Sequence, residues 1–262
     1  MKKLIFSAFI ATALFVSSCG KDDENGGGST SLTGDWYLYN IYNDPDGNGK
    51  SWASPDNCSE KSYYSISDKK IKYEWYGLEG SECKYAPRYY NYTINNGVIN
   101  MTVAEDSPND KIGSKSSVKY EMKGKELFFS FKSGGYDVIT VLHKKGVDYS
   151  YLDPLVGLWE LTKIEAGGTT YPAGTPACFT GSIVASSIGF SLYYTLPANS
   201  TQCQAGKVES YDYVKEGNKY YNVTDPQNKE ELALVFSENN TKLSYSEQTQ
   251  NGLVTLYFTK VK

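Results

Sequence analysis

The sequence predicts an all-β protein made of two tandem antiparallel domains of about eight short strands each. Alternating apolar and polar residues recur between turn signals along the chain, and no stretch shows a convincing helical pattern. The motif Leu32-Thr33-Gly34-Asp35-Trp36 returns 123 residues later as Leu155-Val156-Gly157-Leu158-Trp159. Each copy opens a segment of one small domain's length, which indicates duplication of a whole domain because the period far exceeds that of a solenoid.

Composition narrows the classes of partner. The chain has 262 residues and a net charge of −4, so its charge alone favours no strongly charged partner. Arg88 is the only arginine. Proteins that read nucleic acids or phosphates favour the bidentate fork of arginine, so we expect no nucleic-acid partner. The 24 tyrosines support β structure.

Residues 1–19 have the layout of an export signal. Lys2 and Lys3 precede an apolar run from Leu4 to Val16, which is short for a membrane-spanning helix. Val16-Ser17-Ser18-Cys19 resembles the lipobox of bacterial lipoproteins, which implies that Cys19 is lipidated and anchors the chain to a membrane. The alternative is an ordinary signal peptide that is cleaved near Cys19.

Residues 20–31 form an expected flexible tether. The segment reads GKDDENGGGSTS and has no apolar residue to bury. Its Lys21-Asp22-Asp23-Glu24 run resembles the acidic export signal of some Gram-negative surface lipoproteins, although a solvated charge run would look the same. We therefore expect an outer-membrane lipoprotein of the cell envelope that is exposed on the cell surface.

Residues 32–146 make up the first expected domain. Its opening strand alternates from Trp36 to Ile41. Asn95-Asn96-Gly97 is a hairpin turn, because these residues tolerate positive φ. The other expected strands are 63–67, 71–76, 89–94, 98–103, 116–122, 126–131 and 137–144. This many short strands joined by hairpin signals is typical of an up-and-down barrel or a sandwich.

A linker over residues 147–154 leads to the second expected domain, residues 155–262. The strand pattern repeats there, with Gly217-Asn218 and Glu238-Asn239-Asn240 at turn positions. The expected strands are 158–165, 182–185, 190–194, 208–214, 219–223, 231–236, 242–246 and 253–260.

The cysteines follow the duplication. Cys58 and Cys83 are 25 residues apart, and Cys178 and Cys203 have the same spacing. Of the three pairings that four cysteines allow, equal spacing within equal repeats favours Cys58–Cys83 and Cys178–Cys203. Disulfides persist in the oxidising compartments that exported proteins reach. A four-thiolate metal site is the alternative, but no Cys-x-x-Cys pair supports it.

These residues resemble a known family. Leu-x-Gly-x-Trp at the start of each repeat, followed in the first by the segment from Asp56 to Tyr63 and a second cysteine, is similar to the lipocalin-like domains of bacterial lipoproteins. The resemblance implies two small up-and-down barrels, with Trp36 and Trp159 as structural plugs at the closed ends. The family's arginine over the opening tryptophan is absent, so Lys144 or Lys260 has to substitute for it.

The resemblance implies a binding role for the barrel interior. The expected inward face of the first repeat contains the ligand-binding candidates Tyr73, Trp75, Tyr90 and Tyr92, and we expect a small apolar or amphipathic ligand. The same aromatic residues would also serve as a packed core. A second hypothesis is a surface module with filled barrels that recognises a protein or a glycan. It rests on four tyrosines expected to be exposed: Tyr37, Tyr39, Tyr63 and Tyr89.

Catalysis has little support in the sequence. His143 is the only histidine, and no nucleophile is matched to it, so we expect no enzyme. Asp44-x-Asp46-x-Asn48-Gly49 matches the first half of a calcium loop, but Pro55 stands where the bidentate acid belongs. We interpret this segment as a polar turn and expect neither a metal nor a cofactor.

Overall fold

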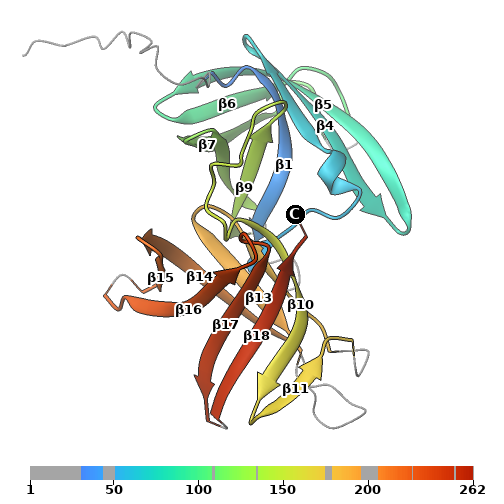
Figure 1. Ribbon diagram of the computed structural model, residues 1–262. Helices are drawn as coiled ribbons and strands as arrows, with labels where there is room; N and C mark the ends of the chain where they lie inside the picture. Colours follow the sequence, from blue (N-terminus) through green and yellow to red (C-terminus); the bar gives the residue numbers. More distant parts are fainter. Residues whose placement is uncertain are drawn as a thin grey trace, which may run out of the picture.

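The computed structural model describes residues 31–43, 51–107, 110–133, 135–174, 179–195, 206–225, 227–250 and 252–261. These residues form eighteen strands and one short 3₁₀ helix, η1 (Ser59–Lys61), and no α-helix occurs among them. The strands make two antiparallel barrels that follow one another along the chain (Figure 1). No helix in the described ranges is long and apolar enough to cross a membrane.

The first barrel is closed by pairing of its first and last strands. The sheet order is β2-β1-β3-β4-β5-β6-β7-β8-β9, and β1 also pairs with β9. Eight strands therefore form the barrel, and β2 is an additional strand at the far end of β1. The strands are β1 (Gly34–Asn43), β2 (Ser51–Ala53), β3 (Tyr63–Ser67), β4 (Lys70–Glu79), β5 (Glu82–Asn95), β6 (Val98–Val103), β7 (Lys115–Lys123), β8 (Glu126–Ser133) and β9 (Tyr136–Lys144).

The second barrel repeats this topology. Its sheet order is β11-β10-β12-β13-β14-β15-β16-β17-β18, and β10 also pairs with β18. The extra strand again lies beside the opening strand. The strands are β10 (Gly157–Ala166), β11 (Thr169–Pro172), β12 (Gly181–Ala185), β13 (Gly189–Tyr194), β14 (Lys207–Glu216), β15 (Lys219–Asn222), β16 (Glu230–Ser237), β17 (Lys242–Thr249) and β18 (Gly252–Lys260).

The all-β class, the two tandem barrels and their eight barrel strands are confirmed. The expected turn between β5 and β6 is confirmed too, since Asn96 and Gly97 have φ values of 48° and 73°. The sequence pattern did not predict β2 and β11, which are only three and four residues long. The strands β4 and β5 are longer than expected, and their hairpin projects from the first barrel (Figure 1).

The projecting hairpin is tied down by a disulfide. Cys58, next to η1, is bonded to Cys83 on β5, and the two Cα atoms are 5.5 Å apart. Asp56 stabilises the turn that leads into Cys58, because its carboxylate accepts hydrogen bonds from the backbone N–H groups of Cys58 (2.8 Å) and Ser59 (2.7 Å). The predicted pairing of Cys58 with Cys83 is therefore confirmed.

One end of each barrel is closed by the repeated tryptophan. Trp36 is 1% exposed, and its Nε1 donates a hydrogen bond of 2.7 Å to the carbonyl of Leu32. Trp159 is fully buried and donates in the same way to Leu155, at 2.8 Å. Both indoles thus donate to a residue four positions earlier in the chain, which explains the equal spacing within the two motifs.

A lysine from the last strand covers each tryptophan. Lys144 Nζ lies 5.4 Å from the ring centre of Trp36, and Lys260 Nζ lies 5.2 Å from that of Trp159. Lys144 also donates to the carbonyl of Ser31 at 3.1 Å, and Lys260 donates to that of Pro154 at 2.8 Å. Both lysines therefore lie where a cation–π contact with the closing indole is possible.

The two barrels are joined by a buried apolar contact. Trp52 of β2, Phe128 of β8 and Val141 of β9 form one cluster with Val184 of β12. Hydrogen bonds reinforce it: the N–H of Trp52 donates to Ser191 Oγ at 2.6 Å, and Asn40 Nδ2 donates to the carbonyl of Ala185 at 2.8 Å. The short strand β2 thus docks the first barrel on the second.

The segment between β9 and β10 is held by both barrels. The Tyr149 hydroxyl donates to the carbonyl of Lys125 at 3.0 Å and accepts from the N–H of Lys144 at 2.6 Å. Asp153 accepts a hydrogen bond of 2.5 Å from the Tyr220 hydroxyl and forms an ion pair of 2.7 Å with Lys215. This connection is therefore a fixed part of the interface between the barrels.

Candidate functional site

The first barrel contains a cavity at the end opposite Trp36. Its volume is about 490 Å³, which is within the range of small-molecule sites. The cavity is bordered by the ends of β1 and β8, the starts of β7 and β9, and the middle of β4, β5 and β6. Below it, the barrel is filled near Trp36 by buried side chains such as Ile66, Ile99 and Leu127. The barrel is therefore packed at one end and hollow at the other.

Aromatic side chains form much of the cavity wall. Tyr73 and Trp75 extend from β4, Tyr90 from β5 and Phe129 from β8. The ring of Tyr73 stacks on that of Tyr64, with centroids 4.1 Å apart. Burial raises the pKa of Tyr73 and that of Tyr90, so both phenols are neutral hydrogen-bond donors at neutral pH.

Three of the four ligand-binding candidates thus surround one space, and the fourth does not. Tyr92 lies further along β5 towards the closed end, where its hydroxyl donates a hydrogen bond of 3.0 Å to the carbonyl of Ser67. Its ring packs against the core that contains Trp36. Tyr92 is thus absent from the set of residues that line the cavity.

Arg88 is a cavity residue that was not among the residues predicted from the sequence. It pairs with Tyr73 across β4 and β5 and lines the cavity two residues before Tyr90. Side chains two apart on a strand point to the same face, so Tyr90 was the signal that could have placed Arg88 inside. The guanidinium lies 5.9 Å from the ring centre of Trp75 and 3.4 Å from Asp110 Oδ2.

Polar groups complete the site. Ser116, Thr140 and Lys132 line the cavity with the aromatic residues. Thr140 is 7% exposed, and its hydroxyl oxygen has no hydrogen-bond partner among the described residues. Buried hydroxyls are normally paired, so this one is a candidate contact for a bound molecule. The cavity therefore combines an apolar wall with a few polar groups.

The second barrel uses its interior differently. Eighteen buried apolar or aromatic side chains of its described part form one continuous core, including Trp159, Phe190, Tyr194 and Tyr245. The matching cluster around Trp36 has eight. The strand register makes Ile183 the counterpart of Tyr64, and Leu192 that of Tyr73. Two of the tyrosines beside the first barrel's cavity are thus replaced by aliphatic core residues.

Charge also differs between the two barrels. Tyr73 pairs with Arg88, and its counterpart Leu192 pairs with Glu209, so a carboxylate occupies the position of the guanidinium. Glu209 accepts a hydrogen bond of 2.6 Å from the Tyr211 hydroxyl. The duplicated fold therefore presents opposite charges at equivalent positions.

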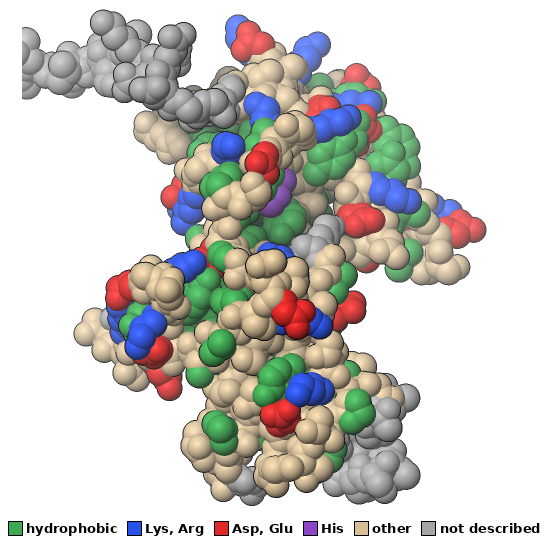
Figure 2. Space-filling model, in the orientation of Figure 1, with side chains coloured by type: hydrophobic (Ala, Val, Ile, Leu, Met, Phe, Trp, Pro, Cys, Tyr) green, Lys and Arg blue, Asp and Glu red, His purple; other side chains and the backbone are tan. Residues whose placement is uncertain are grey.

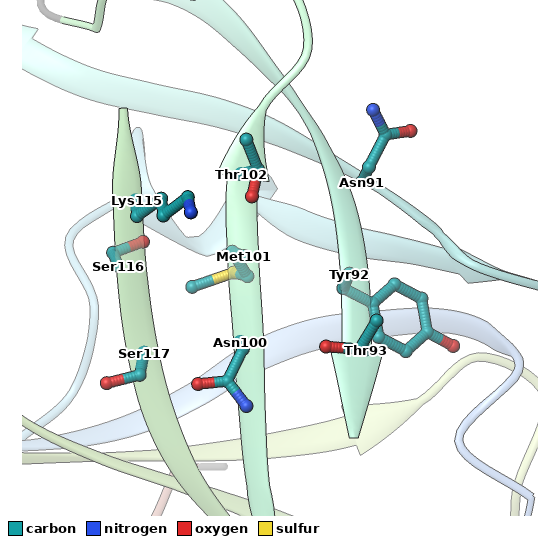
Figure 3. A pocket seen from close by; sticks show the side chains of 9 residues that line it. All are labelled: Asn91, Tyr92, Thr93, Asn100, Met101, Thr102, Lys115, Ser116 and Ser117. Atoms are coloured by element: carbon teal, nitrogen blue, oxygen red, sulfur yellow. The ribbon is translucent and has the colours of Figure 1, made fainter. Parts of the chain in front are cut away.

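A second hollow lies on the outer face of the first barrel. Its volume is about 520 Å³, and it runs across β5, β6 and β7 (Figure 3). Six polar side chains of these strands point to the same outer face by strand alternation. They are Asn91, Thr93, Asn100, Thr102, Lys115 and Ser117. In the described part of the chain, no hydrogen bond or ion pair engages these six side chains, so their donors and acceptors are free to bind.

The four tyrosines that motivated the surface hypothesis are not exposed, and that expectation was wrong. Tyr37 and Tyr63 stack on each other, with centroids 4.9 Å apart, and both are half-buried. Tyr39 and Tyr89 are half-buried as well. The alternation of residues along a strand predicts which side of the sheet each side chain is on, but it does not predict which neighbouring side chains cover it. On the face that Figure 2 shows, charged side chains of both signs are scattered in small groups.

His143 belongs to the junction between the barrels. Its ring stacks between those of Tyr39 and Tyr149, with centroids 3.8 Å away on each side. Its Nε2 lies 2.8 Å from Glu126 Oε1, and Glu126 has no exposed surface. Both faces of the imidazole are covered, and His143 does not line the cavity. This arrangement indicates a structural role.

Several predicted residues lie outside the described part of the chain. They are the lipidation residue Cys19, the cysteines Cys178 and Cys203, and the turn from Asp44 to Asn48. Among the residues that are described, no group of three His, Cys, Asp or Glu side chains is arranged to hold a metal ion.

A closed antiparallel barrel with an open cavity opposite a buried tryptophan defines a class of small binding domains. Residues 32–129 match the family model of the lipocalin-like domain. The match covers most of the first barrel, and the second barrel has the same strand order. The fold is generally a binding fold. No curated protein matches the chain.

Two solved structures are similar to part of this chain. One is a lipocalin-like protein from Bacteroides uniformis ATCC 8492, with 16% identity and a TM-score of 0.31, covering 43% of this chain and 97% of that one. The other is an uncharacterized protein from Bacteroides eggerthii DSM 20697, with 17% identity and a TM-score of 0.29, covering 44% of this chain and 99% of that one.

Proposed function

We propose that this chain is a lipid-anchored binding protein of the cell envelope whose first barrel holds a small apolar or amphipathic ligand. The observation that supports it most is the cavity of about 490 Å³ with aromatic walls and few polar groups. The second barrel, with its continuous core, acts as a rigid base for the first.

The ligand test is native mass spectrometry of the chain purified from its host. We expect a co-purifying small molecule, and we expect Met101→Phe to reduce its occupancy because the larger ring takes up cavity volume. Asn100→Phe is the matched control, since Asn100 is exposed on the outer face of the same strand. Equal occupancy in both variants would place the molecule elsewhere, and a wild-type chain that never carries or binds a small molecule would refute the proposal.

Anchoring has a separate test. The lipobox ending at Cys19 supports lipidation, and the acidic run that follows supports transfer to the cell surface. We expect metabolic labelling with a fatty acid to mark the wild-type chain and not Cys19→Ser. Protease treatment of intact cells should remove both barrels. Full protection of the chain would contradict surface exposure, while lipidation could still hold.

Recognition of a glycan or a protein at the outer face of the first barrel is the second candidate function. The six free polar side chains of the hollow on β5, β6 and β7 favour it. Their amides and hydroxyls could exchange hydrogen bonds with a polar surface. In this case Asn100→Phe should abolish binding to a glycan array or to cells, and Met101→Phe should leave it intact.

A further inference from the structure

The single arginine of the chain is placed inside the cavity of the first barrel. Arg88 extends from β5 among Tyr73, Trp75 and Tyr90, and its side chain is 26% exposed. Long cationic side chains usually keep their heads in water. The only arginine of the chain is therefore unusual, because most of its side chain is covered among aromatic cavity residues.

The guanidinium is only partly neutralised. Among the described residues, its ion pair joins Nε to Asp110 Oδ2 at 3.4 Å, which is long for a charge-assisted hydrogen bond. The same carboxylate oxygen also receives a weak hydrogen bond of 3.4 Å from the Ser107 hydroxyl. A guanidinium has five N–H donors in a planar fork, and the Tyr90 hydroxyl is a second partner here, so donors for another acid group remain.

The rest of the cavity sets the shape of the molecule that would reach this cation. Trp75, Met101 and Phe129 provide apolar contacts around it. At protein packing density, 490 Å³ accommodates roughly 20 non-hydrogen atoms. The geometry fits a ligand with a compact apolar body and one acidic group.

We propose that the first barrel selects an amphipathic anion, a carboxylate on an apolar body, by pairing its acidic group with Arg88. This inference rests on the proposed binding function and adds the charge of the ligand. The second barrel has Glu209 at the equivalent position. Any preference for anions thus comes from Arg88 and not from the barrel fold itself.

The experiment compares two dyes that share an apolar body, anionic anilinonaphthalene sulfonate and neutral N-phenyl naphthylamine. The sulfonate serves as a fluorescent stand-in for the carboxylate. The protein is the whole mature chain from Gly20 without lipid, which keeps both barrels and their connection. A medium-chain fatty acid and the corresponding alcohol then compete with the dyes, so that a carboxylate is tested directly.

We expect Arg88→Gln to weaken binding of the anionic dye on the order of tenfold, because a charge-assisted hydrogen bond is lost. Binding of the neutral dye should weaken by less than about threefold. Arg88→Lys should restore most of the anionic binding, and Asp110→Asn should strengthen it. Lys84→Gln is the matched control, because Lys84 lies on the same strand as Arg88 but outside the cavity, and its side chain is 48% exposed and pairs with Glu82. The fatty acid should displace the anionic dye more strongly than the alcohol does.

Each outcome supports or contradicts the pairing of Arg88 with the acidic group of a ligand. An equal loss of both dyes in Arg88→Gln, with folding confirmed by thermal denaturation, would make Arg88 structural and overturn the inference. Unchanged binding of the anionic dye would overturn it as well. If the wild-type chain binds the neutral dye but shows no preference for the anionic dye, the proposed binding function stands and the proposed selectivity for an anion is contradicted. A chain that binds neither dye nor competitor refutes both.

Discussion

Trp52 of the first barrel lies against Gly189 of the second so closely that a Cβ on Gly189 would come within 2.5 Å of Trp52 Nε1. The same Cβ would also lie 2.9 Å from the carbonyl oxygen of Tyr211. Only a glycine leaves room for the indole there. A strand of three residues thus uses one large side chain to join two barrels into a single body.

Trp52→Ala should separate the unfolding of the two barrels. The wild-type contact buries the whole indole, and its loss should cost about 3–5 kcal/mol, as for other tryptophans truncated in cores. Differential scanning calorimetry should show one transition for the wild type and two for the variant. Tyr136→Ala, at a tyrosine that is 49% exposed, is the control and should keep one transition. A single transition in Trp52→Ala would show that the other interface contacts suffice.

Lys144→Met should destabilise the first barrel by about 0.5–2 kcal/mol, because it removes the cation 5.4 Å from the ring centre of Trp36. Lys144→Arg should keep most of this stability, since a guanidinium also stacks on an indole. Urea denaturation followed by tryptophan fluorescence measures both. Lys145→Met is the control at an exposed neighbouring lysine. If Lys144→Met and Lys145→Met behave alike, the ring contact adds no stability.

Replacing both Cys58 and Cys83 with serine should lower the free energy of unfolding by about 2–4 kcal/mol, because the unfolded chain loses a cross-link over 25 residues. Guanidinium denaturation with and without reductant tests it, and reductant should then have a smaller effect on the variant than on the wild type. In non-reducing peptide maps we expect Cys178 paired with Cys203. A Cys58–Cys178 bridge would contradict the pairing in both domains.

Glu74→Gln should destabilise the first barrel at neutral pH and much less in acid. Burial by itself would raise the pKa of Glu74, but hydrogen bonds from Lys72 and from the hydroxyls of Tyr85 and Tyr63 outweigh it and lower that pKa. Because the folded pKa is below the unfolded one, the carboxylate stabilises the fold above the unfolded value of 4.5, and this contribution is lost as pH falls through the folded value.

The expected difference between wild type and Glu74→Gln is about 1–3 kcal/mol at pH 7, as for buried hydrogen bonds to charged groups. It should shrink as the pH drops well below about 4. Urea denaturation at several pH values measures the difference. Glu121→Gln, on the outer face of β7 where its side chain is 66% exposed, should show little effect at any pH. A constant difference across the pH range would exclude the charge of Glu74 as the cause.

Local patterns determined most of the architecture. Alternation at period two and Asn-Gly chemistry were enough to place the sixteen barrel strands, because both signals act within a few residues of the chain. The repeated Leu-x-Gly-x-Trp motif identified both closing tryptophans, because the indole is satisfied by a carbonyl four residues earlier. Equal cysteine spacing likewise anticipated the bridge between Cys58 and Cys83.

Only the tertiary structure decided where the chain is hollow. Tyr73, Trp75 and Tyr90 could be assigned to one face from sequence, but a void depends on the summed volume of side chains that eight strands bring together. That sum leaves a cavity of about 490 Å³ in the first barrel and a larger continuous core in the described part of the second, although the two share one topology. The register between β4 and β5, which no short sequence pattern contains, placed Arg88 opposite Tyr73. The packing of one barrel on the other placed Trp52 against Gly189.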